Sequence, residues 1–244
     1  MNGVLNIFKP KGMSSFDAVR VVKKVARTGK VGHTGTLDPE ATGVLPICIG
    51  RATKIIDYIM DSEKVYEVTL KLGIRTTTYD LEGEVLEEID PSHLTEEEIL
   101  NSINSFKGEY SQIPPMYSAL KQNGVRLYEL ARKGIEVERK GRLINIHNLE
   151  DIKINNPYIS MKVTCSKGTY IRSLCYDIGE KLGVFATMTQ LNRAKTSVFS
   201  QEKSININEL TKENINDYIL SMEEALEKYD KIVVNKKYVK LLVN

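Results

Sequence analysis

One aspartate of this sequence lies in a loop rich in glycine. The segment GKVGHTGTLDPEATGVLPICIG, residues 29 to 50, places Asp38 directly before Pro39 and five residues after His33. Glycine adopts positive φ and lets a backbone approach a neighbour closely, so such a loop can hold a carboxylate against a substrate. Pro39 disfavours the helical region for Asp38 and narrows the directions in which its carboxylate can point. A carboxylate held in this way could act as a nucleophile or a general base.

Asp38 also has an ordinary structural interpretation. Aspartate before proline is a natural helix N-cap with proline at the first helical position, and Glu40 favours a helix start. Gly43 would end that helix after one turn, which is too short to form in isolation. Both roles are compatible, because a carboxylate at a helix N-terminus stays ionised. The residues by themselves leave the two interpretations open.

Other kinds of chemistry find little support. The sequence contains neither GxxxxGK[ST] nor GxGxxG, and Gly29, Gly32 and Gly35 are spaced by three, so a phosphate loop is poorly supported. It lacks GxSxG, and only His33 lies near the candidate site, which argues against a Ser-His-Asp hydrolase. Three scattered histidines make a catalytic metal improbable. The cysteines form no CxxC pair, and we expect buried, reduced thiols at Cys48, Cys165 and Cys175.

Composition indicates a globular protein. The 244 residues are 41% apolar and 27% charged, which fits one large domain, alone or with an appendage. The sequence has no apolar run near the roughly 20 residues that span a bilayer and no signal peptide at its start, so we expect a cytoplasmic protein with no membrane partner. Basic residues outnumber acidic ones by nine to three in residues 1–54 and by seven to three in 121–142, while residues 82–109 are acidic. This alternation suits either solvated helix faces or a phosphate-binding face.

Strands and helices are expected to alternate irregularly around the candidate loop. A helix starting at Ser14 or Ser15 precedes it and a strand at 44–49 follows, then a short helix at 51–60. Tyr66 begins an apolar alternation typical of a half-buried strand. We further expect strands at VLNIF, LINIHNL, ISMKVTC and FATMTQL, a helix opened by the capping box Thr95-x-x-Glu98 and running to about residue 106, and a short helix ending at 134.

Another helix is expected between residues 169 and 183. Its buried stripe comprises Ile171, Leu174, Cys175, Ile178 and Leu182, which leaves Arg172 off that stripe. The irregular order of elements predicts an α+β fold with a central mixed, mainly antiparallel sheet flanked by helices.

Five segments, in order, resemble the motifs of the TruB-type tRNA pseudouridine synthases. GHTGTLDPEATGVLPICIGRATK is similar to the catalytic motif, and the others are NIFKPKGMSSFDAV, the tyrosine strand KVYEVTLKLG, the T-arm-gripping insertion QIPPMYSALKQNGVRLYELARKG and the arginine motif CSKGTYIRSL. The resemblance covers about residues 3–200. It implies the pseudouridine synthase fold, with a catalytic domain at 1–200, an insertion at about 112–140, and a C-terminal helical extension at 201–244.

The same resemblance implies an activity. The enzyme would isomerise uridine 55 in the T-loop of tRNA, by base flipping, cleavage of the N-glycosidic bond and reattachment through C5, with no cofactor. Asp38 would be the essential carboxylate, Arg172 its ion-pair partner, and Tyr66 the ring that stacks on the flipped uracil and takes part in the C5 proton step. The chain would act as a monomer without a protein partner.

The resemblance also implies substrate contacts. His33 would enter the T-loop where the target base has left it, and Leu191 would pack against that base. Lys9 and Pro10 would brace the catalytic loop. The candidates for phosphate contacts are Lys121, Arg126, Arg132 and Lys133.

Two departures from the family stand out. Many relatives continue into a small PUA-like RNA-binding domain, and the sequence ends at YVKLLVN, about where that domain would begin, so we expect the domain to be absent or truncated. Asn192 replaces a basic residue before Arg193. Two alternative functions remain open at this stage: a tRNA-folding factor whose chemistry is incidental or lost, and an RNA-guided, dyskerin-type relative that needs partner proteins.

Overall fold

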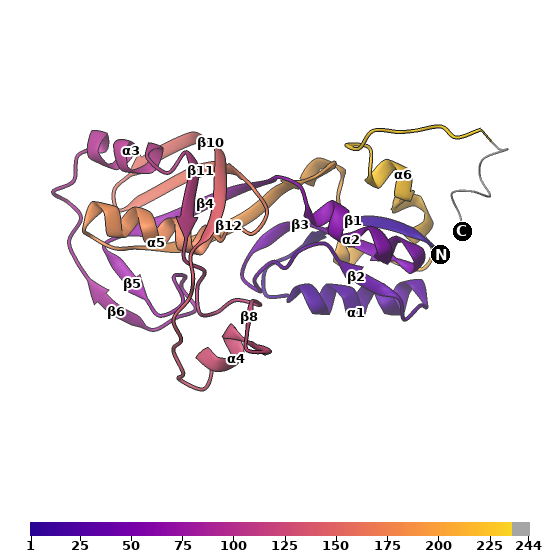
Figure 1. Ribbon diagram of the computed structural model, residues 1–244, viewed down its shortest axis with the longest axis horizontal. Helices are drawn as coiled ribbons and strands as arrows, with labels where there is room; N and C mark the ends of the chain where they lie inside the picture. Colours follow the sequence, from indigo (N-terminus) through magenta and orange to yellow (C-terminus); the bar gives the residue numbers. More distant parts are fainter. Residues whose placement is uncertain (236–244) are drawn as a thin grey trace.

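An eleven-stranded sheet is the frame of the molecule in the computed structural model, which describes residues 1–235 (Figure 1). Its main path runs β14-β1-β3-β12-β4-β11-β10-β7, with β2 beside β3, β13 beside β12 and β15 beside β1. The pairs β1–β14 and β3–β12 are parallel and the other pairs in this sheet are antiparallel. The predicted mixed, mainly antiparallel sheet is therefore confirmed.

The strands of the main sheet are β1 (Gly3–Lys9), β2 (Val31–His33), β3 (Thr42–Ile49), β4 (Lys64–Leu72), β7 (Gly108–Gln112), β10 (Arg142–Asn155), β11 (Tyr158–Cys165), β12 (Ala186–Thr196), β13 (Phe199–Ser200), β14 (Ile205–Asn206) and β15 (Ile219–Leu220). Two separate hairpins are β5 (Ile74–Thr76) with β6 (Val85–Glu88), and β8 (Lys121–Gln122) with β9 (Val125–Arg126). The α-helices are α1 (Ser15–Ala26), α2 (Ile56–Met60), α3 (Glu96–Asn104), α4 (Leu127–Ala131), α5 (Ile171–Leu182) and α6 (Met222–Ala225), and the 3-10 segments are Gly50–Ile55, Gln201–Lys203, Ile207–Glu209 and Ile215–Tyr218.

The two halves of the sheet are joined where β3 lies beside β12. Figure 1 shows α1, β1, β2 and β3 at one end of the molecule and α3, α5, β10 and β11 at the other. The junction has two register pairs, Asn192 with Thr42 and Arg193 with Gly43. Gly43 has a φ of +111°, and a Cβ on it would lie 2.3 Å from the Arg193 carbonyl oxygen. Only glycine permits this approach of the two strands.

Capping residues define the ends of the helices that flank the sheet. Ser14 and Asp17 form a capping box at the start of α1, and Thr95 and Glu98 form the predicted one at α3. Helix α5 ends at Gly183, whose φ is +70°. In one half of the sheet α1 packs on β2 and β3, and in the other α5 packs on β12 and β4.

Several expected elements differ from the structure. No helix follows Asp38: residues 39 and 40 form a turn, because Gly43 already belongs to strand β3. The helix expected at 51–60 is a 3-10 segment followed by the short α2. The extension expected to be helical from residue 201 contains α6 and three 3-10 segments, but also the short strands β14 and β15, whose backbones pair with β1. Its last residues, 236–244, lie outside the described part.

The burial of the cysteines tests one further expectation. Cys48, Cys165 and Cys175 are buried free thiols, as predicted, and burial raises the pKa of Cys48 and of Cys165 to about 12. Within residues 1–235, the helices are too short or too polar to cross a membrane.

Candidate active site

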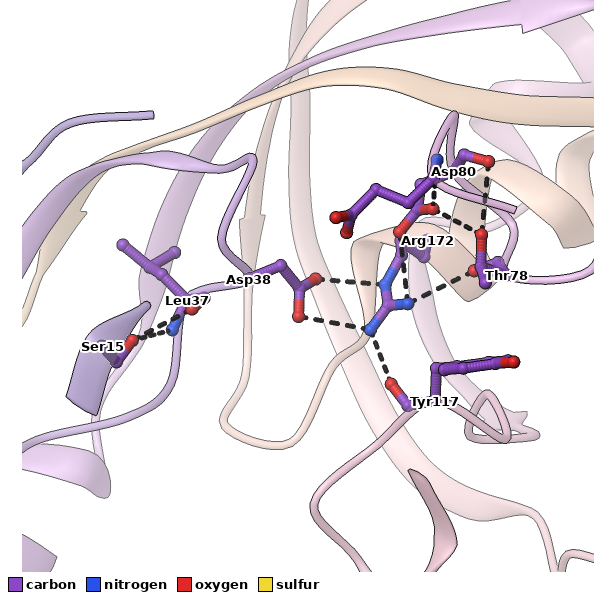
Figure 2. Close-up of polar contacts among 8 residues, drawn as sticks. Ser15, Leu37, Asp38, Thr78, Asp80, Tyr117 and Arg172 are labelled. Atoms are coloured by element: carbon purple, nitrogen blue, oxygen red, sulfur yellow. Dashed lines mark hydrogen bonds and ion pairs between the residues drawn. The ribbon is translucent and has the colours of Figure 1, made fainter. Parts of the chain in front are cut away.

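Backbone contacts fix the loop that carries Asp38. The amide of Ala41 donates to the Asp38 carbonyl over 3.1 Å and closes a turn. The buried Ser15 hydroxyl accepts from the Leu37 amide at 2.8 Å and lies 3.0 Å from the Leu37 carbonyl (Figure 2). On the other side, the Pro39 carbonyl accepts from the Lys9 ammonium at 3.1 Å. The residue on each side of Asp38 is therefore held by an element outside the loop.

Asp38 and Arg172 form a two-pronged ion pair. Arg172 Nε lies 3.1 Å from Oδ2 of Asp38, and Arg172 Nη2 lies 3.3 Å from Oδ1 (Figure 2). The planar guanidinium matches both carboxylate oxygens and so fixes the plane of the carboxylate as well as its position. The Asp38 side chain keeps 32% of its surface exposed, whereas that of Arg172 keeps 8%. The carboxylate is thus aimed from a buried support and stays accessible to a ligand.

Three further acceptors hold Arg172. Its Nη1 lies 3.3 Å from the Asp80 carboxylate and donates to the Thr78 carbonyl at 3.3 Å, and its Nη2 donates to the Tyr117 carbonyl at 2.8 Å (Figure 2). Arg172 was expected to lie off the buried stripe of its helix, but it is buried. The reason is its place in the first turn of α5, where the segments carrying Thr78 and Tyr117 cover it.

Burial and nearby charges shift the pKa of Asp38. Burial raises the pKa of this carboxyl above the ordinary 3.8, the positive charge of Arg172 opposes the rise, the negative charge of Asp80 adds to it, and Lys9 lowers it. A carboxylate with a raised pKa is a stronger base than an exposed one. Titratable groups shifted in this way are characteristic of functional sites.

Tyr66 lies on the strand next to β12 and is buried. Burial raises the pKa of its phenol, the charge of Arg193 and a side-chain hydrogen bond with it lower that pKa, and the charge of Asp38 raises it. Tyr66 is paired in register with Arg193, whose guanidinium donates to the Gly35 carbonyl, so the strand of Tyr66 and the loop of Asp38 meet at Arg193 although 28 residues separate Asp38 from Tyr66 in the sequence. The Tyr66 ring belongs to the main hydrophobic core, which can fix its orientation.

The other predicted contact residues lie on β1, β2 and β12. Lys9 is fully buried and its ammonium also donates to the carbonyls of Pro10 and Met13, at 3.0 and 2.7 Å. His33 ends β2, and burial together with the charge of Arg193 lowers its pKa, which favours the neutral form of its ring. Leu191 is half-buried on β12 and lines a groove of about 590 Å³, of which Asp38 is not a lining residue.

The predicted phosphate-contacting residues lie on a projection away from the sheet. Figure 1 shows β8 and α4 extending from the body of the molecule on a looped segment. The four residues predicted to contact phosphates are exposed, namely Lys121, Arg126, Arg132 and Lys133. Two of them lie near the ring of Tyr128, at 5.8 Å for Arg126 and 5.4 Å for Arg132. The Tyr117 carbonyl that binds Arg172 lies at the root of the same projection.

Sequence reasoning missed the residues that support the ion pair. Asp80 is buried and accepts from Thr78 Oγ1 and the Glu82 amide as well as from Arg172. An aspartate side chain that accepts from the amide two residues later forms a common local turn. The residues around Asp80 therefore carry no signal of a distant partner. Ser15 was considered only as a helix cap, yet its hydroxyl is committed to Leu37.

Two family models match the chain. The model described as "TruB family pseudouridylate synthase (N terminal domain)" matches residues 23–171, and that described as "tRNA pseudouridylate synthase B C-terminal domain" matches 172–227. The chain belongs to the TruB family of pseudouridylate synthases. It is accordingly an enzyme of the isomerase class. The boundary between the two models lies at the start of α5, and strands on both sides of it share the main sheet.

Individual relatives agree with this assignment. A protein named tRNA pseudouridine synthase B from Clostridium perfringens is 64% identical over 245 residues, covering 100% of this chain and 83% of the relative. One of the same name from Clostridium tetani is 61% identical over 244 residues, covering 100% and 84%. Among solved structures, a Cbf5-Nop10-Gar1 complex contains a chain with a TM-score of 0.72 and 30% identity, covering 92% of this TruB-family chain and 61% of that one. The TruB-type pseudouridine synthase fold predicted from the sequence is confirmed.

Asp80→Asn is expected to lower the rate of the chemical step by about 100-fold. Without its ion pair to Asp80, the Arg172 guanidinium holds the Asp38 carboxylate less firmly, and a displacement of about 1 Å can cost a rate factor of that size. The variant also removes the negative charge that raises the pKa of Asp38. The acid limb of the rate profile should therefore move to lower pH. Single-turnover rates across pH measure both effects. An unchanged rate, or a limb that moves to higher pH, would contradict this role of Asp80.

Proposed function

We propose that this chain isomerises uridine 55 in the T-loop of tRNA to pseudouridine. The observation that carries the proposal is the two-pronged Asp38–Arg172 ion pair, with its carboxylate partly exposed and Tyr66 nearby, in a chain of the TruB family. Relatives that match the whole chain are named tRNA pseudouridine synthase B.

The target base must leave the T-loop before the reaction. A base stacked inside a folded loop is out of reach of a carboxylate, and extruding it costs a few kcal/mol. The neutral ring of His33 is suited to fill the space left by the base through stacking. Exposed basic side chains of the projection are suited to bind phosphates of the T-arm, namely Lys121, Arg126, Arg132 and Lys133. The free energy of these contacts would offset part of the cost of extruding the base.

The reaction then rearranges one nucleoside. The bond between N1 of uracil and the sugar C1′ breaks, a bond between C5 and C1′ forms, C5 loses its proton, and N1 gains one. Asp38 acts on the nucleoside as nucleophile or base, whether the reaction starts at the sugar or at the ring. Tyr66 stacks on the flipped uracil and takes part in the C5 proton step, and Leu191 packs against the base.

The isomerisation changes no oxidation state and transfers no external group, so we propose that it needs no cofactor. The chain would act as a monomer on tRNA. Solved complexes of Cbf5 with Nop10 and Gar1, and of an H/ACA RNP bound to a substrate RNA, contain structurally similar chains, with TM-scores of 0.72 and 0.68. These neighbours make an RNA-guided, partner-dependent activity the alternative to test.

The purified chain alone is expected to release tritium from a T-arm hairpin labelled at C5 of uridine, because bonding at C5 displaces that hydrogen. A hairpin with cytidine in place of the target uridine, labelled at its remaining uridines, is the control and should release none. Release that requires added proteins or a guide RNA would replace the proposal by the RNA-guided alternative. Release from the control hairpin would overturn the assignment of the target position.

A further inference from the structure

A buried arginine outside the ion pair carries the further inference. Arg193 is 1% exposed and is among the largest fully buried side chains. Within residues 1–235, no carboxylate forms an ion pair with it. Burying a charge without a counter-ion costs free energy that an apolar side chain of similar size would avoid. The mechanism described above gives this charge no role.

The hydrogen bonds of Arg193 reach both ends of the catalytic loop. Its Nε donates to the Val44 carbonyl at 2.7 Å, and its Nη2 donates to the Gly35 carbonyl at 3.2 Å. Gly35 precedes Asp38 and Val44 follows it. A Cβ on Gly35 would lie 3.7 Å from Nη1 of the same guanidinium. One side chain on β12 therefore clamps the loop before and after the catalytic carboxylate.

The same residue is the neighbour of Tyr66 across the sheet. Arg193 is paired in register with Tyr66 on β4 and with Gly43 on β3, so it lies between the strand that carries Tyr66 and the strand that follows the Asp38 loop. Residues paired across neighbouring antiparallel strands present their side chains on the same face of the sheet, so the guanidinium and the phenol are neighbours, and the charge of Arg193 lowers the pKa of Tyr66 against the effect of burial. The preceding residue, Asn192, forms different bonds at the same junction. Its side-chain amide accepts from the Thr42 hydroxyl at 3.0 Å and donates to the Glu67 carboxylate at 2.9 Å.

We propose that Arg193 is a positioning residue for the isomerisation, which holds both ends of the Asp38 loop against β12 and fixes the phenol of Tyr66 beside them. The carboxylate and the ring then belong to one rigid unit across the β3–β12 junction, where backbone pairing alone is short. The proposal rests on the proposed function, since it concerns the same reaction.

Arg193→Lys tests the clamp while keeping the charge. Lysine has one nitrogen in place of the separate Nε and Nη2 donors that contact the Val44 and Gly35 carbonyls, so the clamp loses its fixed geometry and the single-turnover rate is expected to fall by about 100-fold. The Kd for the hairpin should stay within about twofold of the wild type, since Arg193 is buried away from solvent. Arg193→Met, which also removes the charge, should lose more. Rates are compared at a temperature at which circular dichroism shows each variant folded.

Asn192→Ala is the matched control, because it removes bonds at the same junction on the other side. Its single-turnover rate is expected within about twofold of the wild type, because the bonds of Asn192 go to the side chains of Thr42, Glu67 and Gln201 and not to the backbone of the Asp38 loop or to Tyr66. Equal losses in Asn192→Ala and Arg193→Lys would mean that both residues only hold the junction together. That result, or a wild-type rate in Arg193→Lys, would overturn the proposal.

A spectroscopic measurement separates positioning from general damage. With 3-fluorotyrosine placed at position 66, the fluorine NMR signal reports the surroundings of the phenol. Arg193→Lys and Arg193→Met should shift this signal, and Asn192→Ala should leave it in place. A rate loss with an unmoved signal would refute the contact with Tyr66. Because this measurement needs no turnover, it still tests the contact if the wild type proves inactive on the hairpin, which would refute only the proposed function.

Discussion

Asp38→Asn is expected to lower tritium release from C5 of the target uridine by at least about 10,000-fold, as does removal of other catalytic groups that act as a unit. The substitution keeps the size of the side chain and one carbonyl oxygen for Arg172, but it removes the negative charge needed to attack or to accept a proton. The Kd for tRNA should stay within about twofold, since phosphate contacts dominate such affinities. Single-turnover release and filter binding measure the two quantities.

The same variant has a predictable effect on stability. The pKa of Asp38 is raised in the folded state above its unfolded value near 3.8, so the folded state favours the protonated carboxyl. Stability is therefore lost as pH rises from that value through the folded-state pKa. At pH 7 Asp38→Asn should melt at a higher temperature than the wild type, and below pH 3.8 the difference should disappear. A lower melting temperature at pH 7 would show that the ion pair outweighs the burial cost.

Glu40→Gln is the matched control for Asp38→Asn. Glu40 lies two residues away in the same turn and pairs with Lys11 at 3.0 Å on the surface. Its loss should change the rate by less than about twofold, as for most exposed ion pairs. If Asp38→Asn retained release, the catalytic role would be wrong. If it lost release but still promoted tRNA folding, a folding role beside catalysis would be supported.

Elements with local signals were predictable from the sequence. The capping boxes at Ser14 and Thr95 are set by residues three apart, so they need no tertiary information. The alternation around Tyr66 predicted strand β4 for the same reason. The turn at Asp38 was harder, because the helix-start signals of Asp38 and Pro39 compete with the pairing of β3, which depends on strands far along the chain.

The supports of the site depend on contacts between distant residues. Arg172 contacts Asp38, 134 residues away in the sequence, and Asp80, 92 residues away. Arg193 contacts Gly35, which is 158 residues away. Nothing in the local sequence distinguishes Asp80 from a turn residue or Arg193 from an exposed strand arginine. The resemblance to a family suggested the pair of Asp38 and Arg172, whereas the residues that hold the pair became visible only with the fold. The catalytic roles of Asp38, Tyr66 and Arg172 stay predictions, as do the substrate contacts of the other site residues.

Arg172→Lys is expected to lower the single-turnover rate by about 100- to 1,000-fold, an effect of the size seen when one preorganised donor is removed. Lysine keeps the charge but cannot place two donors on Asp38 while binding Asp80 and the Tyr117 carbonyl. The carboxylate would then rotate out of the plane that the guanidinium imposes. Arg75→Lys is the control: its partner Glu87, at 2.9 Å, is half exposed, and its rate should stay within about twofold.

Arg172→Met separates the charge from the geometry. It leaves Asp38 and Asp80 without their shared cation, and breaking a buried ion pair by removing one partner costs about 3–5 kcal/mol of stability. Because Arg172 lowers the pKa of Asp38, its removal should move the acid limb of the rate profile to higher pH, opposite to the shift expected for Asp80→Asn. In Arg172→Lys the limb should move less, since the charge remains. Equal rates in the Lys and Met variants would mean that the two-pronged geometry, rather than the charge, carries the whole effect of Arg172.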